Sequence, residues 1–269
     1  MNQPPPRGVD PNIPSVARMY DYHLRGKENY PKDRAVADQV HQDNPNVRLG
    51  MRENRHFLRR AVTYLAGECN IRQFLDIGSG LPTSGNVHEI AQRLNPTARV
   101  IYIDNDASVL THARALVDGD DKVRVVAGDM RRVQDILDDR EVQHFINWNE
   151  PVGLILVALL HFISDKHDPY HLVTTLRDQL PPGSYMALSH GSADGFSRAQ
   201  ISPVEEHYEQ ATEQLALRSQ ESIVRFFDGF DLVPPGVVLV PTWRPDGISE
   251  GEDPRRCGTF GGVGRVRVA

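Results

Sequence analysis

The sequence predicts an α/β fold in which helices cover both faces of a mostly parallel, doubly wound sheet. From about residue 71, short β-branched runs alternate with helical stretches, which is typical of βαβ units. The strand candidates are "RQFLDIG", "ARVIYIDND", "KVRVVAGD", "VGLILVALL" and "GSYMALSH". Ligands bind such a sheet at the carboxyl ends of its strands. We therefore expect functional residues directly after strands.

The N-terminal part of the chain has a different pattern. Residues 1–11 are rich in proline and polar groups, so we expect a disordered arm there. Residues 12–70 contain "SVARMYDYHL" and "FLRRAVTYLAGE", in which apolar residues recur three and four positions apart. This spacing predicts an N-terminal helical extension, followed by an α/β domain over residues 71–269.

The C-terminal part carries weaker signals. Its pattern predicts a further helix over about residues 203–220. The runs "GFDLVPPGVVLVPTW" and "CGTFGGVGRVRV" then predict a closing antiparallel pair of strands. Their glycine and proline content leaves the ends of these strands open.

Composition argues against several classes of protein. The 269 residues carry a formal net charge of -6, with 36 acidic residues against 30 Lys and Arg, so a broad basic surface for nucleic acid is not expected. The longest apolar run, residues 152–160, is too short to cross a bilayer, and no targeting segment is recognisable. Cys69 and Cys257 lack metal-type spacing. We expect a cytoplasmic protein without a nucleic-acid partner, a membrane partner or a metal.

The stretch "QFLDIGSGLPTSGN" contains the first candidate site. Its strand ends in Asp76, and Gly78 and Gly80 allow the backbone to adopt positive φ and to approach a ligand closely. Asn86 and Glu89 have the spacing of a helix capping box. The resulting order of strand, glycine loop and helix is the context that a nucleotide site requires.

Two further strands end in acids. "RVIYIDND" ends in Asp104, whose carboxylate suits the two hydroxyls of a ribose, and Asp106 is a candidate cap of the next helix. "VRVVAGDM" ends in Asp129, which suits an exocyclic amino group, and Met130 offers an apolar contact to a ring. With Asp76, three successive strands end in acids, which is more specific than any one acid.

On these motifs the sequence resembles the class I S-adenosylmethionine-dependent methyltransferases. "LDIGSG" is similar to their glycine motif, "YIDND" to their ribose-binding acid and "AGDM" to their adenine-side acid. More narrowly, "NIPSVARMYDYHLRGKENYPKDR", "RENRHFLRRAV" and "QFLDIGSGLPTSGNVHE" resemble an actinobacterial family of uncharacterised S-adenosyl methyltransferases, formerly a domain of unknown function. The resemblance implies a Rossmann-like, seven-stranded sheet with an antiparallel C-terminal strand, and S-adenosyl-L-methionine as the cofactor.

The resemblance also implies which residues bind the cofactor. They follow the first three strands and are Asp76, Gly78, Ser79, Gly80, Leu81, Asp104, Asn105, Asp129 and Met130. The physical chemistry agrees, because the sulfonium and ammonium groups of this cofactor are positive and suit Asp76. A pyrophosphate would be repelled there.

By the same resemblance, residues 12–70 would form a lid that covers the cofactor and completes the acceptor pocket. The candidate residues are Arg18, Tyr20, Tyr22, Arg52, Asn54 and Arg55. For each of them the alternative is a surface or packing role. Together, arginine and aromatic side chains would favour a small aromatic or anionic acceptor.

Two histidines that follow later strands are candidates for the acceptor chemistry. "HFISD", with His161, resembles the segment of small-molecule O-methyltransferases in which some members use the histidine as general base. An imidazole with a pKa near ~6.5 can accept a proton at neutral pH. The alternative for His161 is a packing or capping role. His190, in "MALSH", is the second candidate, also with a structural alternative.

The sequence thus predicts a methyltransferase that acts on a small molecule. O-methylation is favoured over N-methylation, because "VALLHF" replaces the polar motif that follows the fourth strand in many amino-methylating enzymes. One alternative is a non-catalytic S-adenosylmethionine-binding sensor or partner protein. The other is an NAD-dependent oxidoreductase. Two residues disfavour it: Thr83 replaces the third glycine of the dinucleotide motif G-x-G-x-x-G, and Asp76 would repel a pyrophosphate. No motif identifies the acceptor or the oligomeric state.

Overall fold

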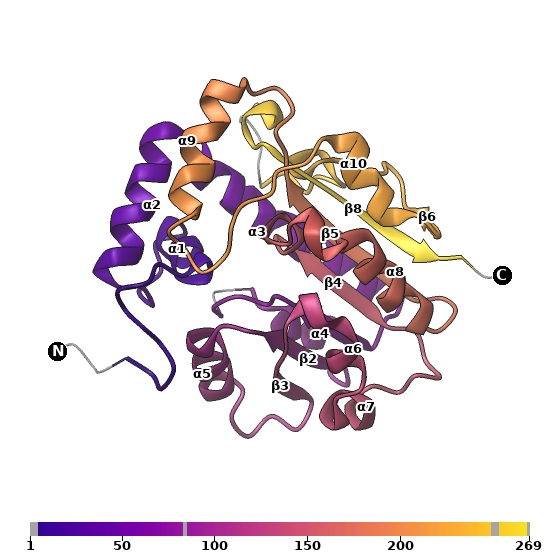
Figure 1. Ribbon diagram of the computed structural model, residues 1–269. Helices are drawn as coiled ribbons and strands as arrows, with labels where there is room; N and C mark the ends of the chain where they lie inside the picture. Colours follow the sequence, from indigo (N-terminus) through magenta and orange to yellow (C-terminus); the bar gives the residue numbers. More distant parts are fainter. Residues whose placement is uncertain (1–4, 83–84, 249–252, 268–269) are drawn as a thin grey trace.

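The computed structural model describes residues 5–82, 85–248 and 253–267, in which eight strands form one sheet (Figure 1). The strands are β1 (Gln73–Ile77), β2 (Arg99–Asp104), β3 (Val123–Ala127), β4 (Gly153–Val157), β5 (Tyr185–Gly191), β6 (Phe230–Leu232), β7 (Val238–Leu239) and β8 (Thr259–Val266). Their order is β3-β2-β1-β4-β5-β8-β6, and the two-residue β7 pairs with β8 outside this order. Neighbours among β1 to β5 are parallel, whereas β8 is antiparallel to β5, β6 and β7. The predicted sheet is confirmed, with β7 as an addition.

Helices cover both faces of the sheet, as predicted. One face packs on α6 (Val133–Leu137), α7 (Arg140–Phe145), α8 (Pro169–Gln179) and α10 (Gln220–Val224), and the other on α3 (Val47–Thr63), α4 (Val87–Leu94) and α5 (Ala107–Leu116). Strand β1 shows why both faces need cover: Leu75 and Ile77 lie in the first core and Phe74 in the second. The strand ends are thereby held rigidly.

The predicted N-terminal helical extension consists of α1 (Val16–His23), α2 (Pro31–Asp43), α3 and the π-helical turn η1 (Tyr64–Glu68). Met19, Val36 and Val40 form a small core of their own with Val204 and Tyr208. The last two belong to α9 (Arg198–Tyr208), which lies beside α2 in Figure 1. A helix distant in sequence therefore completes this layer.

The predicted helix over residues 203–220 is wrong at both ends. Helix α9 begins after Ser197, whose capping box with Gln200 starts it five residues before Pro203. It ends at Tyr208, and residues 209–219, which we call the strap, run back across the molecule before α10 begins. The proline misled the prediction because it suits the first turn of a helix but here lies inside one.

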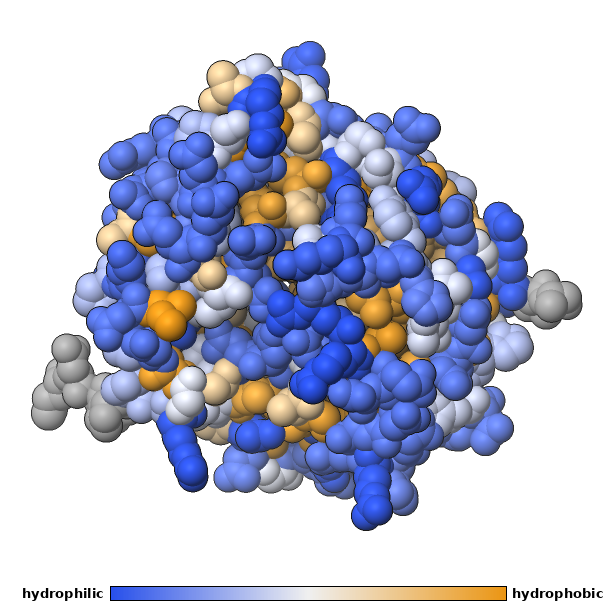
Figure 2. All heavy atoms as spheres, in the orientation of Figure 1, coloured by the Kyte–Doolittle hydropathy of each residue, from blue (hydrophilic) through white to orange (hydrophobic). Residues whose placement is uncertain are grey.

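The remaining short turns connect these layers. They are the 3-10 turns η2 (Met130–Arg132), η3 (Leu160–Phe162), η4 (Asp165–His167), η5 (Arg225–Phe227), η6 (Val240–Thr242) and η7 (Pro254–Arg256). Along the described ranges, no helix is long and apolar enough to cross a membrane. The face shown in Figure 2 is mostly hydrophilic, and its apolar side chains lie in small separate groups.

Candidate functional site

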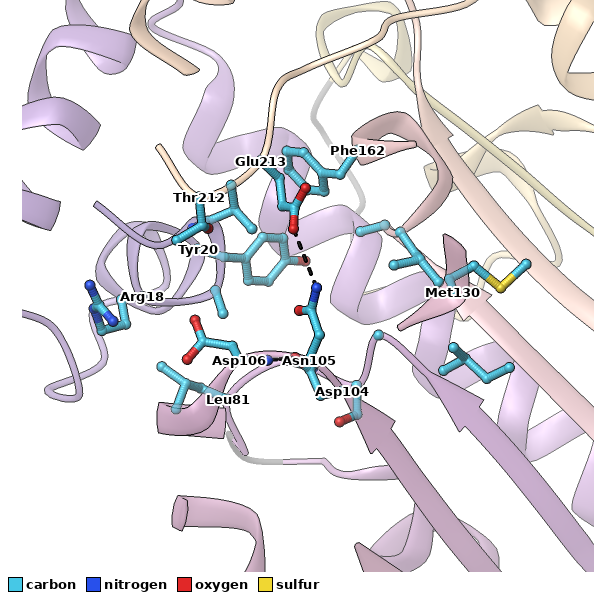
Figure 3. A pocket seen from close by; sticks show the side chains of 18 of the residues that line it. Arg18, Tyr20, Leu81, Asp104, Asn105, Asp106, Met130, Phe162, Thr212 and Glu213 are labelled. Carbon is cyan, nitrogen blue, oxygen red and sulfur yellow. Dashed lines mark hydrogen bonds between the residues drawn. The ribbon is translucent and has the colours of Figure 1, made fainter. Parts of the chain in front are cut away.

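A cavity of about 390 Å³ lies at the carboxyl ends of β1 to β4, between the sheet and the N-terminal helices. It is lined by all nine residues predicted to bind the cofactor: Asp76, Gly78, Ser79, Gly80, Leu81, Asp104, Asn105, Asp129 and Met130. Figure 3 shows Asp104, Asn105 and Met130 at the strand ends, with Tyr20 and Phe162 entering from other elements. The structure therefore brings the predicted set together.

The glycine loop is shaped for close approach. Gly78 has φ +71°, and a Cβ there would lie 2.5 Å from a methyl of Leu159, so any larger residue would require Leu159 to move. Gly80 has φ +66°, and its N–H donates to Asp104 Oδ2 over 2.9 Å. Helix α4 then begins with the predicted capping box of Asn86 and Glu89. Thr83, which separates the loop from a dinucleotide motif, lies outside the described residues.

Two buried carboxylates meet below this loop. Asp104, 8% exposed, accepts from Gly80 N–H and from Asp106 N–H, yet burial raises its pKa to about 6. Asp76, 6% exposed, has its pKa raised to about 7 by burial, an effect that Arg55 opposes and Asp104 reinforces. Within the described ranges no hydrogen-bond donor reaches the Asp76 carboxylate. A buried acid without a donor calls for a cationic ligand group.

The predicted adenine side is built around Asp129. Its carboxylate accepts from the N–H and the guanidinium of Arg131, and although burial alone would raise its pKa, these contacts lower it. Arg131 also pairs with Glu213 over 2.8 Å. Asn105 Nδ2 donates to the same Glu213 over 3.3 Å (Figure 3). Met130 is buried beside them.

Glu213 belongs to the strap and was missed by the sequence analysis. A backbone hydrogen bond holds the strap against the N-terminal segment: the N–H of Thr212 donates to the Pro14 carbonyl over 2.8 Å. Both Thr212 and Glu213 line the cavity. The sequence analysis missed both residues because it expected a helix over residues 203–220. Charged residues at helical spacing usually belong to a solvent-exposed face.

Four of the six predicted lid residues line the cavity: Arg18, Tyr20, Asn54 and Arg55. The guanidinium of Arg18 is buried against Asp33, and that of Arg55 donates to the Gly85 carbonyl. The other two point elsewhere, since the Tyr22 hydroxyl donates to Asp38 and Arg52 Nε donates to Glu53. Arg52 and Tyr22 are therefore not brought to the cavity.

Neither predicted histidine is among the residues that line the cavity. His161 Nδ1 accepts from the Gly191 N–H over 3.2 Å, so the neutral ring carries its proton on Nε2. Burial, with Arg218 near by, lowers its pKa to about 3. His190 is fully buried, donates from Nδ1 to the Gly191 carbonyl and accepts from Arg218 at Nε2. This geometry disfavours His161 as a general base, a role that stays a prediction.

Further cavity residues had no signal in the sequence analysis. Gly8, Val9 and Asp10 come from the predicted arm, of which residues 5–11 are described. The apolar Leu58 comes from α3, and the consecutive Phe162 and Ile163 come from the end of η3. Ala158, at the end of β4, has φ +56°, which is strained for a residue with a Cβ. Nothing in the sequence distinguishes an alanine in this conformation.

Two solved structures resemble this chain over nearly its whole length. A crystal structure of a candidate methyltransferase from Thermobifida fusca is 40% identical, covers 98% of this chain and 99% of that chain, and superposes with a TM-score of 0.90. A DUF574 family protein from Streptomyces avermitilis is 38% identical, with coverage of 96% and 99% and a TM-score of 0.91.

More distant structures share the fold. An O-methyltransferase family 2 protein from Planctomyces limnophilus, solved with apigenin, is 16% identical with a TM-score of 0.50 and coverage of 88% of this chain and 67% of that chain. At this identity the likeness shows the fold alone. A search of curated proteins found no match. The family model of the S-adenosyl methyltransferases called Methyltransf_19 matches residues 2–267, so the chain belongs to this family of S-adenosylmethionine-dependent methyltransferases.

Proposed function

We propose that this enzyme transfers the methyl group of S-adenosylmethionine to a small-molecule acceptor, at oxygen in preference to nitrogen. The observation that carries the proposal is Asp76, a buried carboxylate that faces the cavity and to which no described donor bonds. Burial raises its pKa, and the positive charge of Arg55 offsets this only in part. The ammonium and sulfonium of the cofactor supply further positive charge.

The residues present fit the parts of this cofactor. Asp76 would hold the ammonium and Arg55, which lines the same end of the cavity, the carboxylate of the methionine part. Each oxygen of Asp104 accepts one N–H and keeps a lone pair for a ribose hydroxyl. Asp129 already accepts the backbone N–H, Nε and Nη2 of Arg131, so it keeps less capacity than Asp104 and would accept the adenine amino group with what remains, while Met130 would lie against the ring.

The cofactor, when bound, supplies an activated methyl group on sulfur. The chain's own contribution is to align the acceptor and to exclude water. As the new bond to the acceptor forms, the bond between the methyl and the sulfur breaks, its electron pair stays on sulfur, and the acceptor releases one proton. The sequence predicted His161 as the acceptor of that proton, but its Nδ1 already accepts the Gly191 N–H and it does not line the cavity, so we expect His161→Ala to keep its transfer rate, and a large loss of rate would restore the role.

Two observations support a small acceptor. Residues of α1, the α3 residues Asn54 and Arg55, the arm and the strap line the cavity together with the strand ends, which frames a compact site suited to a small molecule. The net charge of -6 also disfavours nucleic acid. Preference for oxygen rests on "VALLHF" after β4, where a polar motif typical of amino-methylating enzymes is lacking.

Isothermal titration calorimetry with S-adenosylmethionine and S-adenosylhomocysteine tests the proposal. We expect both to bind, and Asp76→Asn to weaken binding by about 30-fold or more, since removing one partner of a buried charge pair costs about 2–5 kcal/mol. Asp135→Asn, at an exposed ion pair with Arg132, is the matched control. Equal affinity of the Asp76→Asn variant and the wild type would contradict the proposed site.

A further inference from the structure

A chain of hydrogen bonds links the end of β4 to two N-terminal helices. The N–H of the strained Ala158 donates to Ser189 Oγ over 3.0 Å. Ser189 Oγ in turn donates to Asn54 Oδ1 over 2.5 Å, and Asn54 Nδ2 donates to Tyr20 Oη over 3.0 Å. The chain ends where Tyr20 Oη donates to the Met51 carbonyl over 3.0 Å. It thus joins β4, β5, α3 and α1.

The donor-to-acceptor direction of these hydrogen bonds determines which donor and which acceptor remain unused next to the cavity. Ser189 accepts the Ala158 N–H, so its own proton goes to Asn54 Oδ1, and the Asn54 amide is oriented with Nδ2 toward Tyr20. Among the described residues, no atom accepts the second N–H of Asn54, which is 3% exposed. Tyr20 Oη keeps one unused lone pair. Both residues line the cavity.

The second N–H of Asn54 and the unused lone pair of Tyr20 Oη determine which ligand groups can bind to both. A ligand group that satisfies both must accept the Asn54 N–H and donate to Tyr20 Oη. A hydroxyl does so, whereas a carboxylate has no proton to donate and an ammonium has no lone pair to accept with.

Apolar side chains line the same cavity as this pair, and the charge of Arg55 also acts on the Tyr20 hydroxyl. Leu58, Phe162 and Ile163 line the cavity with the pair, and Figure 3 shows Tyr20 and Phe162 entering from different elements. An apolar ring matches this lining. A phenol also ionises near pH ~10, as tyrosine does, so its proton is lost to water more readily than that of an aliphatic alcohol. This matters because His161 does not line the cavity and its Nδ1 lone pair accepts the Gly191 N–H.

We propose that Tyr20 and Asn54 bind the acceptor's hydroxyl group and that the acceptor is an uncharged phenolic molecule, an inference that rests on the proposed methyl transfer. The phenolic oxygen bonds to the methyl carbon as the carbon–sulfur bond breaks, and the phenolic proton passes to water. Ser189 is a positioning residue, since it acts through Asn54. The acceptor is thus neither anionic, which the lid arginines alone had suggested, nor cationic.

Saturation-transfer NMR and calorimetry on the protein saturated with S-adenosylhomocysteine test this inference. The probe is p-cresol, compared with p-xylene, 4-methylbenzoate and 4-methylbenzylamine. We expect p-cresol to bind most tightly. Tyr20→Phe should weaken it by about 3- to 10-fold, the value of one net hydrogen bond, and Ser189→Ala should weaken it less. For p-xylene, Tyr20→Phe should change nothing.

The matched control is Tyr170→Phe, which also removes a hydroxyl that donates to a backbone carbonyl, that of Ser222, but outside the cavity. Thermal melting and S-adenosylhomocysteine affinity establish that each variant is folded. Binding of 4-methylbenzoate or the amine above p-cresol, no binding of p-cresol, or unchanged affinity in Tyr20→Phe would overturn the inference. If S-adenosylhomocysteine itself does not bind, the proposed function fails instead.

Discussion

The edge of the sheet presents side chains to the cavity through backbone register, whereas the N-terminal helices of residues 12–70, the predicted lid, present them through buried polar contacts between helices. At the edge, Ile77 is paired with Ile103 and Asp104 with Ala127, so that residues after three strands fall side by side. In the lid, Asp33 accepts from the Ser15 N–H, the Tyr30 N–H and Arg18. Register is a local property of strands, but these lid contacts depend on how separate helices meet.

The substitution Asp33→Asn should have the largest effect, because it should destabilise the lid and leave the sheet edge stable. The Arg18–Asp33 pair is buried, and an amide nitrogen in place of Asp33 Oδ2 would face the donors of Arg18 and Tyr30. We expect a loss of about 3–5 kcal/mol in the free energy of unfolding of the lid. Hydrogen exchange should show this loss in α1 and α2, with β1 and β4 still protected.

The control for this prediction is Asp135→Asn, whose partner Arg132 is exposed. It should change stability by about 0.5 kcal/mol or less. An equal loss of protection across the sheet in Asp33→Asn would mean that the lid and the edge unfold as one cooperative unit. This would contradict the expectation that the lid depends on its own polar contacts.

At the edge, the two loop glycines give a matched pair. Both have positive φ, so alanine at either position incurs a similar backbone strain of about 1–2 kcal/mol. Only Gly78→Ala also pushes a Cβ against Leu159, whereas Gly80 has open space around it. Chemical denaturation should give a loss about 1–3 kcal/mol larger for Gly78→Ala. Equal losses would show that Leu159 moves aside freely.

The pH dependence of both stability and cofactor affinity should arise from two acids at the edge of the sheet. Asp76 and Asp104 have folded-state pKa values of about 7 and about 6, raised above 3.8, so their contribution to stability without cofactor is present below pH ~4 and is lost as the pH rises through 6 to 7. Conversely, a cationic ligand binds the ionised form. We expect affinity for S-adenosylmethionine to rise from pH 5 to 8, by up to about tenfold per unit for one released proton.

Calorimetry in two buffers of different ionisation enthalpy measures that proton release directly. The Asp76→Asn variant should lose most of the pH dependence. A flat affinity profile between pH 5 and 8 in the wild-type protein would contradict the assignment of a cationic cofactor group to Asp76.

The sequence by itself determined the α/β class and the positions of the principal strands along the chain, and its resemblance to a known family indicated the nine residues expected to bind the cofactor. The physical reason is that Asp76, Asp104 and Asp129 each end an apolar run, and parallel strands bring their carboxyl ends to one edge whatever else the chain does. The capping of α4 by Asn86 could be read for the same local reason.

The tertiary structure alone decided which lid residues face the cavity, where α9 ends and what Glu213 does. Tyr20 and Tyr22 are two residues apart on one helix, yet only Tyr20 meets Asn54, because helix packing sets the rotation of α1. Glu213 meets Arg131 across 82 positions of sequence. The donor direction from Ser189 to Tyr20 likewise exists only once β5, α3 and α1 are assembled, since each hydrogen bond in it joins separate elements.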